Sequence, residues 1–350
     1  MDEVWSERNT TPAKIEAALR RIVAEQYHSD HPFVPARVLN VVAIVDAEFR
    51  GEIENRFERV GRYHPSRLVL CAVEPGRETI DAWAGVGTED AMPVPGHIAL
   101  ARERVEIEIG RRHLSGLDTI VDPLLVSDLA TMVWAPHGHD EGVDAVRRLA
   151  QIVLVDTQDE PDVGRSLARV AELSEHAYVV DLAWLRSTPW RERVAAAFDP
   201  PALRASLSGV SAVTVRHRDD SLAAAMLFCG WLSSRLGWKP GPLSQSDRYR
   251  TGHARARRQE VRIRLEPAAQ DAPGLAGVTI ETASGEAISL DRAPGGLKAV
   301  RRARDGSEHS WTVLGASRGE GGILGEGVRQ ALLRDPTYRP ALSCAQVFAR

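Results

Sequence analysis

The chain has 350 residues, 43% of them hydrophobic and 26% charged, which is the composition of a folded globular protein with room for one large domain or two smaller ones. Its 44 basic and 48 acidic residues give a formal net charge of −4, so the composition argues against nucleic acid as a partner. Three scattered cysteines, Cys71, Cys229 and Cys344, argue against a disulfide framework and a zinc site. A cytoplasmic location is therefore expected.

The start of the chain and its apolar runs argue against export and against a membrane partner. The first six residues are acidic and polar, without the basic patch and apolar core of a secretory signal. The longest purely apolar run, residues 222–232, is well short of the roughly 18 residues that a membrane-spanning helix needs. We expect it to form a buried helix.

The first half of the chain alternates between strand and helix patterns. Thr11 is suited to cap a first helix, with Pro12 in its first turn. Residues 37–45 form a β-branched apolar run that is typical of a buried strand. The other expected elements are helices at 49–60, 115–121 and 143–149, strands at 68–73, 129–134 and 151–155, and short one-faced strands between 78 and 110. This alternation predicts an α/β domain over residues 1–165, with a largely parallel sheet flanked by helices.

The second half is predicted to be another α/β domain, residues 166–350, after a polar connection at 156–161. A helix at 221–236 is expected to begin after Asp220 and to end at Gly237. From about residue 258 the apolar period becomes two, which predicts antiparallel strands. The remaining expected elements are helices at 163–173, within 181–198 and at 323–333, and a strand at 210–215.

A glycine-rich stretch at 315–327 contains Gly315-Ala316-Ser317-Arg318-Gly319, a literal match to the Gly-x-Ser-x-Gly nucleophile elbow. In α/β-hydrolases the catalytic histidine follows the serine, whereas the last histidine here is His309, so the triad does not close and no catalytic residue is expected. The same glycines could bind a phosphate through backbone N–H groups, but they lack the Lys-Ser/Thr ending of a P-loop. A flexible glycine loop is the favoured interpretation.

Two further polar stretches have simple structural explanations. His137 and His139 are possible metal ligands, but no third ligand is evident, so a solvated loop is favoured and no metal is expected. The basic run at 248–258 is interpreted as an exposed loop, with an acidic surface of a partner protein as the alternative contact.

Three stretches that together span most of the chain carry a family resemblance. They are Trp5 with 10–12 and the run 37–42, then His64-Pro65-Ser66-Arg67 with the strand 68–70, and residues 181–192 (DLAWLRSTPWRE) with 198–199 and 231–238. In these stretches the chain resembles the OpcA family of glucose-6-phosphate dehydrogenase assembly proteins. The resemblance implies a bacterial, cytoplasmic protein that binds glucose-6-phosphate dehydrogenase and promotes its assembly or active state, as an allosteric activator in the pentose phosphate pathway. It implies no catalytic residues and no cofactor.

Four residues are candidates for partner or anion contacts: Arg67, Trp184, Trp190 and Arg191. Arg67 stands at a strand entrance, where it could clamp a carboxylate or phosphate, although a structural ion pair is the more common use. Trp184 and Trp190 could anchor a partner, although core packing is favoured, since Trp190 shares a helical face with Val194 and Phe198. The rival hypothesis is an enzyme or sensor that binds a sugar phosphate or a nucleotide.

Overall fold

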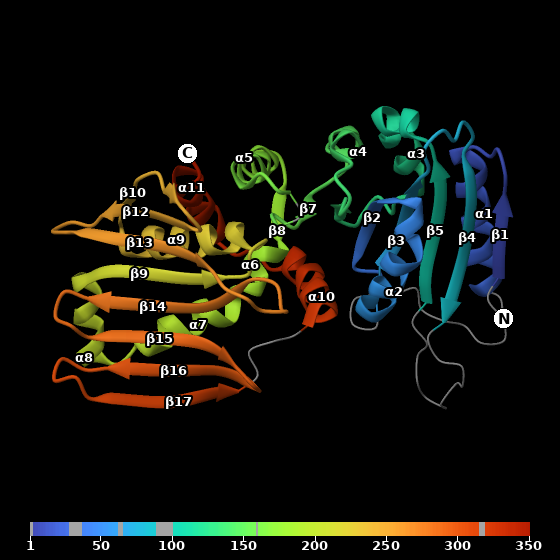
Figure 1. Ribbon diagram of the computed structural model, residues 1–350. Coiled ribbons are helices and arrows are strands. Elements are labelled where there is room, and N and C mark those ends of the chain that lie inside the picture. The colour runs from blue at the N-terminus through green and yellow to red at the C-terminus, as the bar shows by residue number, and fades with distance from the viewer. Residues whose placement is uncertain (1–2, 28–36, 62–65, 89–100, 159, 315–318) are drawn as a thin grey trace, which may run out of the picture. The chain divides into compact units, whose positions relative to one another are not determined.

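The computed structural model describes residues 3–27, 37–61, 66–88, 101–158, 160–314 and 319–350 (Figure 1). The chain divides into two compact units. The first comprises Met1–Val155, His176–Val180 and Leu324–Leu333, and the second comprises Asp156–Glu175, Asp181–Ile323 and Arg334–Arg350. Residue 165, the predicted domain junction, lies in helix α5 (Val163–Ser174), and the position of that junction stays a prediction. His64 and Pro65 of the family signature and residues 315–318 of the Gly-x-Ser-x-Gly match lie outside the described residues.

The first unit is built on an eight-stranded sheet with the order β1-β4-β5-β3-β2-β6-β7-β8. Its strands are β1 (Glu3–Glu7), β2 (Leu39–Asp46), β3 (Ser66–Val73), β4 (Asp81–Thr88), β5 (Ala101–Ile109), β6 (Thr131–Trp134), β7 (Ile152–Val155) and β8 (Tyr178–Asp181). The run β5-β3-β2-β6-β7 is parallel, whereas β4 and β1 are added antiparallel at one edge. Strand β2 is buried from Leu39 to Val45, as expected for a central strand with helices on both faces.

The helices of the first unit form between these strands. They are α1 (Pro12–Tyr27), η1 (Ala47–Phe49), α2 (Arg50–Gly61), η2 (Arg111–Gly116), α3 (Leu117–Val121), η3 (Asp122–Leu124) and α4 (Asp140–Val146). Helix α1 begins at Pro12 as predicted, and its buried residues Ile15, Leu19 and Ile22 recur at helical spacing. The prediction of an α/β unit with a largely parallel sheet is confirmed.

The second unit contains a nine-stranded mixed sheet with the order β10-β12-β13-β9-β14-β15-β16-β17, with β11 paired to β12. Its strands are β9 (Val210–His217), β10 (Lys239–Pro240), β11 (Ser244–Ser246), β12 (Tyr249–Arg255), β13 (Glu260–Pro267), β14 (Leu275–Thr282), β15 (Ala287–Ala293), β16 (Gly296–Arg302) and β17 (Glu308–Leu314). The predicted antiparallel sheet is confirmed, with one addition: β13 runs parallel to β9.

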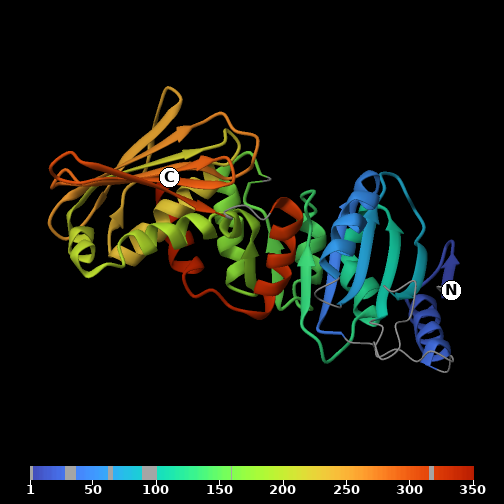
Figure 2. The ribbon, with the colours of Figure 1, turned by 90° about the horizontal axis from the view of Figure 1, so that it is seen from below.

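The helices of the second unit include α5, α6 (Leu182–Arg186), α7 (Thr188–Ala197), α8 (Pro201–Arg204), η4 (Ala205–Gly209), α9 (Leu222–Leu236) and α11 (Tyr338–Phe348). Helices α7, α8 and α9 lie on one face of the sheet (Figure 2). Residues Val261, Ile263 and Leu265 of β13 alternate with exposed residues and point into this core. Among the described residues, no helix is long and apolar enough to cross a bilayer.

Helix α9 is buried at ten of its fifteen positions, which fits its apolar sequence. Its end is set by Gly237, whose φ of +69° is the left-handed conformation that glycine adopts without strain. In the middle of the helix, Gly230 lies against the backbone of α11, and a Cβ there would come within 2.2 Å of the Ala341 carbonyl oxygen. The close approach of these two helices therefore requires glycine at position 230.

Two loop interpretations from the sequence are wrong. Most of the basic run is strand β12, which pairs with β13 and buries Ala254 completely, so Arg250 and Arg255 lie in a strand and not in a loop. The described glycines from Gly319 onward lie in helix α10 (Gly319–Leu332), where burial of Leu324 and Val328 outweighs the poor helix propensity of glycine.

Candidate functional site

Arg67 lies in the first unit, within a buried cluster of charges. It stands opposite Glu103 in the β3–β5 register, and its Nε donates to the Glu103 carboxylate over 2.6 Å. Its Nη1 donates to the Leu124 carbonyl oxygen over 2.9 Å. Arg37 binds the other carboxylate oxygen of Glu103, which is only 2% exposed. Burial lowers the pKa of Arg67. The guanidinium of Arg67 is therefore held by an internal carboxylate, and its contact with an external anion stays a prediction.

Trp184 and Arg191 lie together in the second unit. The guanidinium carbon of Arg191 lies 3.4 Å from the centroid of the Trp184 ring, a close cation–π contact. The indole N–H of Trp184 donates to Asp335 over 2.9 Å, and Arg191 Nη1 lies 3.6 Å from the same carboxylate oxygen. Burial lowers the pKa of Arg191 to about 10, although the Asp335 charge opposes this shift. This cluster joins α6 and α7 to the segment just before α11.

Trp190 packs at a different place in the same unit. Its indole is 2% exposed, and the guanidinium carbon of Arg292 lies 5.8 Å from its ring centroid. The predicted apolar face of Trp190, Val194 and Phe198 is confirmed, since all three are buried. Trp184 is also 2% exposed and Arg191 8% exposed. Side chains this deeply buried first of all hold the unit together, and their contact with a partner stays a prediction.

Asp181 lies next to this cluster, and sequence reasoning did not single it out. It is 1% exposed, and its carboxylate accepts hydrogen bonds from Thr157 Oγ1 over 3.0 Å, Ala183 N over 3.0 Å and Tyr338 Oη over 2.8 Å. The signal in the sequence was an aspartate directly before a helix, which is a common N-cap residue. Nearby, Asp156 and Arg186 form a second buried pair, with 2.7 Å between Oδ2 and Nη1.

Asp181 gives the second unit a specific dependence on pH. Burial, with a smaller effect of the Asp156 charge, raises the pKa of Asp181 from its ordinary value of 3.8 to about 6. Because the folded state binds this proton more tightly than the unfolded chain, the stabilising effect is complete below pH ~4 and is lost as the pH rises through ~6, a change of about 3 kcal/mol.

We therefore expect Asp181→Asn to remove this dependence. Measured by denaturant unfolding from pH ~4 to ~7, the free energy of unfolding of the unsubstituted chain should fall by about 3 kcal/mol relative to that of the variant. Tyr338→Phe removes a donor that lowers the pKa of Asp181 and should move the midpoint of the change to higher pH. Parallel stability profiles for the chain and Asp181→Asn would refute the assignment.

His137 and His139 lie at the carboxyl ends of strands β2 and β6. His139 Nε2 lies 3.1 Å from Asp46 Oδ1, and the Asp46 backbone N–H donates to His137 Nδ1 over 3.0 Å. His139 is 8% exposed, so the solvated-loop interpretation is wrong for this residue. Burial lowers the pKa of both imidazoles. Among the described residues, no group of three or more His, Cys, Asp or Glu side chains could hold a metal ion.

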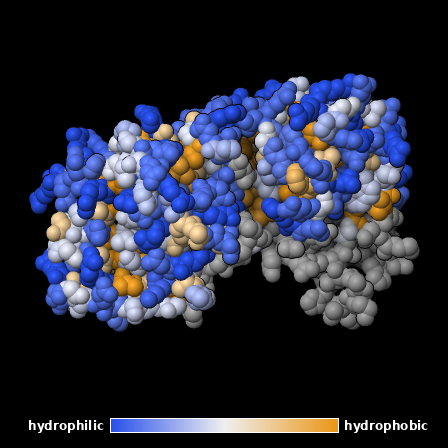
Figure 3. Space-filling model, in the orientation of Figure 1, coloured by the Kyte–Doolittle hydropathy of each residue, from blue (hydrophilic) through white to orange (hydrophobic). Residues whose placement is uncertain are grey.

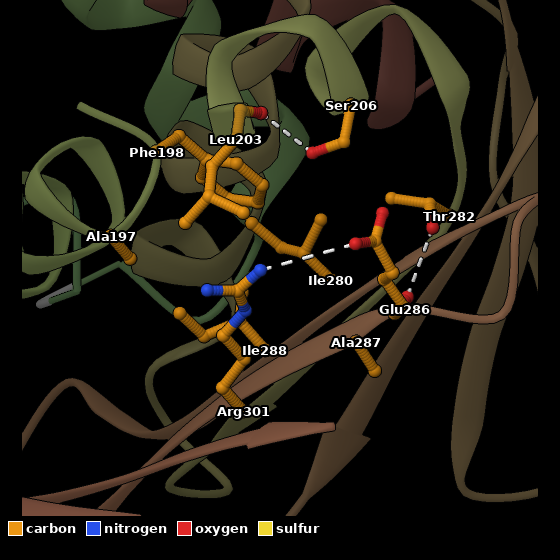
Figure 4. A pocket seen from close by; sticks show the side chains of 10 residues that line it. All are labelled: Ala197, Phe198, Leu203, Ser206, Ile280, Thr282, Glu286, Ala287, Ile288 and Arg301. Carbon is orange, nitrogen blue, oxygen red and sulfur yellow. Dashed lines mark hydrogen bonds and ion pairs between the residues drawn. The ribbon is translucent and has the colours of Figure 1, made fainter. Parts of the chain in front are cut away.

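Two hollows contain none of the four candidate residues. The hollow in the second unit lies between α7, α8 and the sheet, with Phe198, Leu203 and Ile280 on its apolar side and Glu286 near Arg301 (Figure 4). It has room for about 20 Å³ of solvent, or one water molecule. The hollow in the first unit is an open depression of about 320 Å³, lined by Ser6, Glu7, Arg8, Arg50, Asp81, Ala82, Trp83, Glu106 and Glu108.

Two family models match consecutive parts of the chain, and both describe domains of a glucose-6-phosphate dehydrogenase subunit. The model of the N-terminal domain matches residues 57–172, and the model of the C-terminal domain matches residues 177–342. The chain belongs to the OpcA family. The resemblance seen in the sequence is therefore confirmed, and the family match includes all four candidate residues.

Two curated relatives carry the name OpcA, and their names assign them provisionally to the OxPP cycle. The OpcA protein of Synechococcus elongatus is 26% identical over 203 residues, which cover 57% of this chain and 45% of the relative. That of Nostoc punctiforme is 34% identical over 131 residues, which cover 36% of this chain and 28% of the relative. The chain thus spans less than half the length of the curated relatives it matches.

Solved structures resemble this OpcA chain only weakly. A super-repressor mutant of Gal80p from Saccharomyces cerevisiae has a TM-score of 0.49 at 8% identity, covering 84% of this chain and 83% of its own. The apo scyllo-inositol dehydrogenase of Lactobacillus casei has a TM-score of 0.45 at 10% identity, covering 90% of this chain and 96% of its own. No functional conclusion follows from likenesses of this size.

Proposed function

We propose that this OpcA chain is a non-catalytic protein that binds glucose-6-phosphate dehydrogenase and promotes its assembly or active state. The observation that carries the proposal is the match to both domain models of a glucose-6-phosphate dehydrogenase subunit, over residues 57–172 and 177–342. An effector of this kind acts by binding one conformation or oligomer of the enzyme more tightly than another. It therefore needs a surface of roughly 800 Å² per partner and no reactive group of its own.

The charged and nucleophilic residues described above support a non-catalytic role. Arg67, Arg186 and Arg191 are each held by an internal carboxylate. Burial raises the pKa of the Cys71 and Cys229 thiols, so neither is a ready nucleophile. The end of β2 and the start of α2, between which a dinucleotide-binding unit has its glycine-rich phosphate loop, carry Asp46, Glu48 and Glu52. Negative side chains at this place oppose the binding of a pyrophosphate.

The decisive experiment measures glucose-6-phosphate dehydrogenase from the same source with and without the purified chain. We expect a saturable change in its rate of about fivefold or more, or a change in its oligomeric mass, as the concentration of the chain rises. Serum albumin at the same mass concentration controls for crowding. An unchanged rate and an unchanged mass across the titration would refute the proposal.

Conservative variants separate partner contacts from stability. Arg67→Lys, Trp184→Phe, Trp190→Phe and Arg191→Lys each keep the charge or the ring while changing its geometry. For each variant, binding to the dehydrogenase and the free energy of unfolding are measured together. A variant that loses binding at unchanged stability identifies a contact, whereas parallel losses identify a structural residue.

The second candidate function is sugar-phosphate or nucleotide binding, and the depression in the first unit favours it. Its Trp83 offers a ring face for a sugar, and its Arg8 offers positive charge, whereas its Arg50 is already paired with Glu108 over 2.7 Å. Calorimetry of the chain alone with glucose 6-phosphate and with NADP distinguishes the two functions. Tight binding that Trp83→Ala abolishes would favour the ligand-binding function. If no heat of binding is measured, assembly remains as the supported function.

A further inference from the structure

The strands at the ends of the two sheets differ in how well they are protected from pairing with another chain. Strand β1 has five residues and begins and ends with glutamates, β8 has four residues, and β10 has two residues, one of them Pro240. Short strands, charges and proline are the usual features that prevent edge-to-edge association. Strand β17 is longer, with seven residues. It contains no proline, and its one acidic residue stands at its start.

Strand β17 is regular along its whole length. It pairs with β16 in one continuous antiparallel register, from Glu308 opposite Arg302 to Leu314 opposite Gly296, without a bulge. Its only acidic residue, Glu308, stands at its start and faces an arginine. In an antiparallel strand every second residue directs its N–H and C=O away from its neighbour, and within the described residues no further strand lies beyond β17. These backbone groups form an open row of donors and acceptors.

The two faces of β17 suit it for pairing. Ser310 and Thr312 are exposed on the helix-free face of the sheet. Trp311 stands opposite the buried Ala299, on the face that the helices cover, and is itself half-buried. The ring of His309 stacks on the Trp311 ring with 5.5 Å between centroids. A partner strand would thus meet small hydroxyl groups on one face and an aromatic side chain on the other.

The helix-free face of the same sheet is a weaker candidate for docking. Arg216 binds Asp291 over 2.8 Å, and Thr279 and Ser289 share a hydrogen bond of 2.9 Å, so these polar groups satisfy one another. The face that this sheet turns to the viewer in Figure 3 is largely hydrophilic. Within the described residues of this sheet, β17 thus offers a row of unpaired backbone groups, whereas these polar side chains of the sheet face satisfy one another.

We propose that β17 pairs antiparallel with β17 of a second copy of this chain, so that two nine-stranded sheets become one. A two-fold axis at Trp311 is the only such register that pairs all seven residues. It places the two Trp311 rings opposite each other and sets Ser310 of each copy opposite Thr312 of the other. No like charges face each other across this edge, and an aromatic cross-strand pair adds stability. This self-complementarity selects a second copy as the occupant.

The contact is small, so the dimer is weak. A single pair of edge strands with one tryptophan from each copy belongs to the class of interfaces that bury less than ~1,200 Å² in total. We expect a dissociation constant in the micromolar range, around ~10 µM. The dimer goes beyond the proposed binding of a dehydrogenase, and its test uses the chain alone. Each proposal can therefore be refuted while the other stands.

Sedimentation velocity of the full chain from ~1 to ~200 µM tests the proposal. The mass should rise with concentration from 38.3 kDa toward twice that value. Hydrogen exchange at both ends of this range should show that the amides of residues 308–314 that point away from β16, every second one, are protected only at high concentration. The double variant Ser310→Lys with Thr312→Lys places like charges opposite each other and should weaken the dimer by about tenfold or more.

The matched control changes two exposed serines on another edge strand of the same sheet, Ser244→Lys with Ser246→Lys in β11. This variant adds the same charge and should dimerise like the unsubstituted chain. Three outcomes would overturn the proposal: a mass of 38.3 kDa at every concentration, a dimer that the β17 variant leaves intact, or equal weakening by both variants. Circular dichroism of each variant verifies that it is folded.

Discussion

Replacing Glu103 with glutamine is expected to lower the free energy of unfolding of the first unit by about 3–4 kcal/mol, since removing one partner of a buried ion pair leaves uncompensated charge. Glu103 is 2% exposed, and its carboxylate neutralises both Arg37 and Arg67. Glutamine keeps the shape and one acceptor oxygen but removes the charge, so two guanidinium groups are left against a neutral amide. Denaturant unfolding, with hydrogen exchange of β3 and β5 as a local readout, measures the loss.

The matched control is Glu74→Gln. Glu74 also binds an arginine, Arg77, over 2.6 Å, but its side chain is 49% exposed, so its loss should cost less than ~1 kcal/mol. Adding Arg37→Met to Glu103→Gln should recover part of the stability, because it removes one of the uncompensated charges. Equal effects of Glu103→Gln and Glu74→Gln would show that the buried cluster has no special role.

Replacing Trp184 with alanine is expected to destabilise the second unit by about 4 kcal/mol, the range for deleting a large buried aromatic side chain. The substitution leaves a cavity, removes the ring beneath Arg191 and deprives Asp335 of the indole N–H. Trp184→Phe keeps a ring beneath the guanidinium and loses only part of the volume and the hydrogen bond, so it should cost about 1–2 kcal/mol.

Thermal and denaturant unfolding, with hydrogen exchange of α6, α7 and α11, measure both Trp184 variants. The graded loss from phenylalanine to alanine distinguishes a packed structural residue from an exposed partner contact. If Trp184→Ala changed stability by less than ~1 kcal/mol and yet abolished binding to the dehydrogenase, the tryptophan would be a contact and the assignment to the core would be wrong.

Local patterns were sufficient to predict much of the fold. The β-branched run of β2, the apolar face of α7 and the left-handed glycine after α9 all lie where the sequence places them, because each depends on neighbouring residues only. Pairings between distant segments were not predictable in this way. The parallel pairing of β13 with β9 joins strands whose sequences carry no sign of it. Strand β12 was mistaken for a loop because its surroundings are rich in arginine and Ala254 is the one fully buried residue of the strand.

The candidate site shows the same limit. Arg67 was recognised as a clamp for a carboxylate, but its partner Glu103 stands 36 residues later and becomes its neighbour only through the register of β3 and β5. Trp184 and Arg191 are seven residues apart, so their contact is local, whereas Asp335 joins them from 151 residues beyond Trp184. Single residues were identifiable from the sequence, but the charges that neutralise them were not.

The close packing of α11 on α9 at Gly230 has a consequence for synthesis. Residues 338–348 leave the ribosome after the whole nine-stranded sheet, and α9, buried at ten positions in the finished protein, is complete more than a hundred residues earlier. At ~5–20 residues per second, one side of α9 waits about ten seconds for the helix that covers it. The nascent chain exposes an apolar helix throughout that interval, which makes it a natural client for chaperones that bind at the ribosome exit.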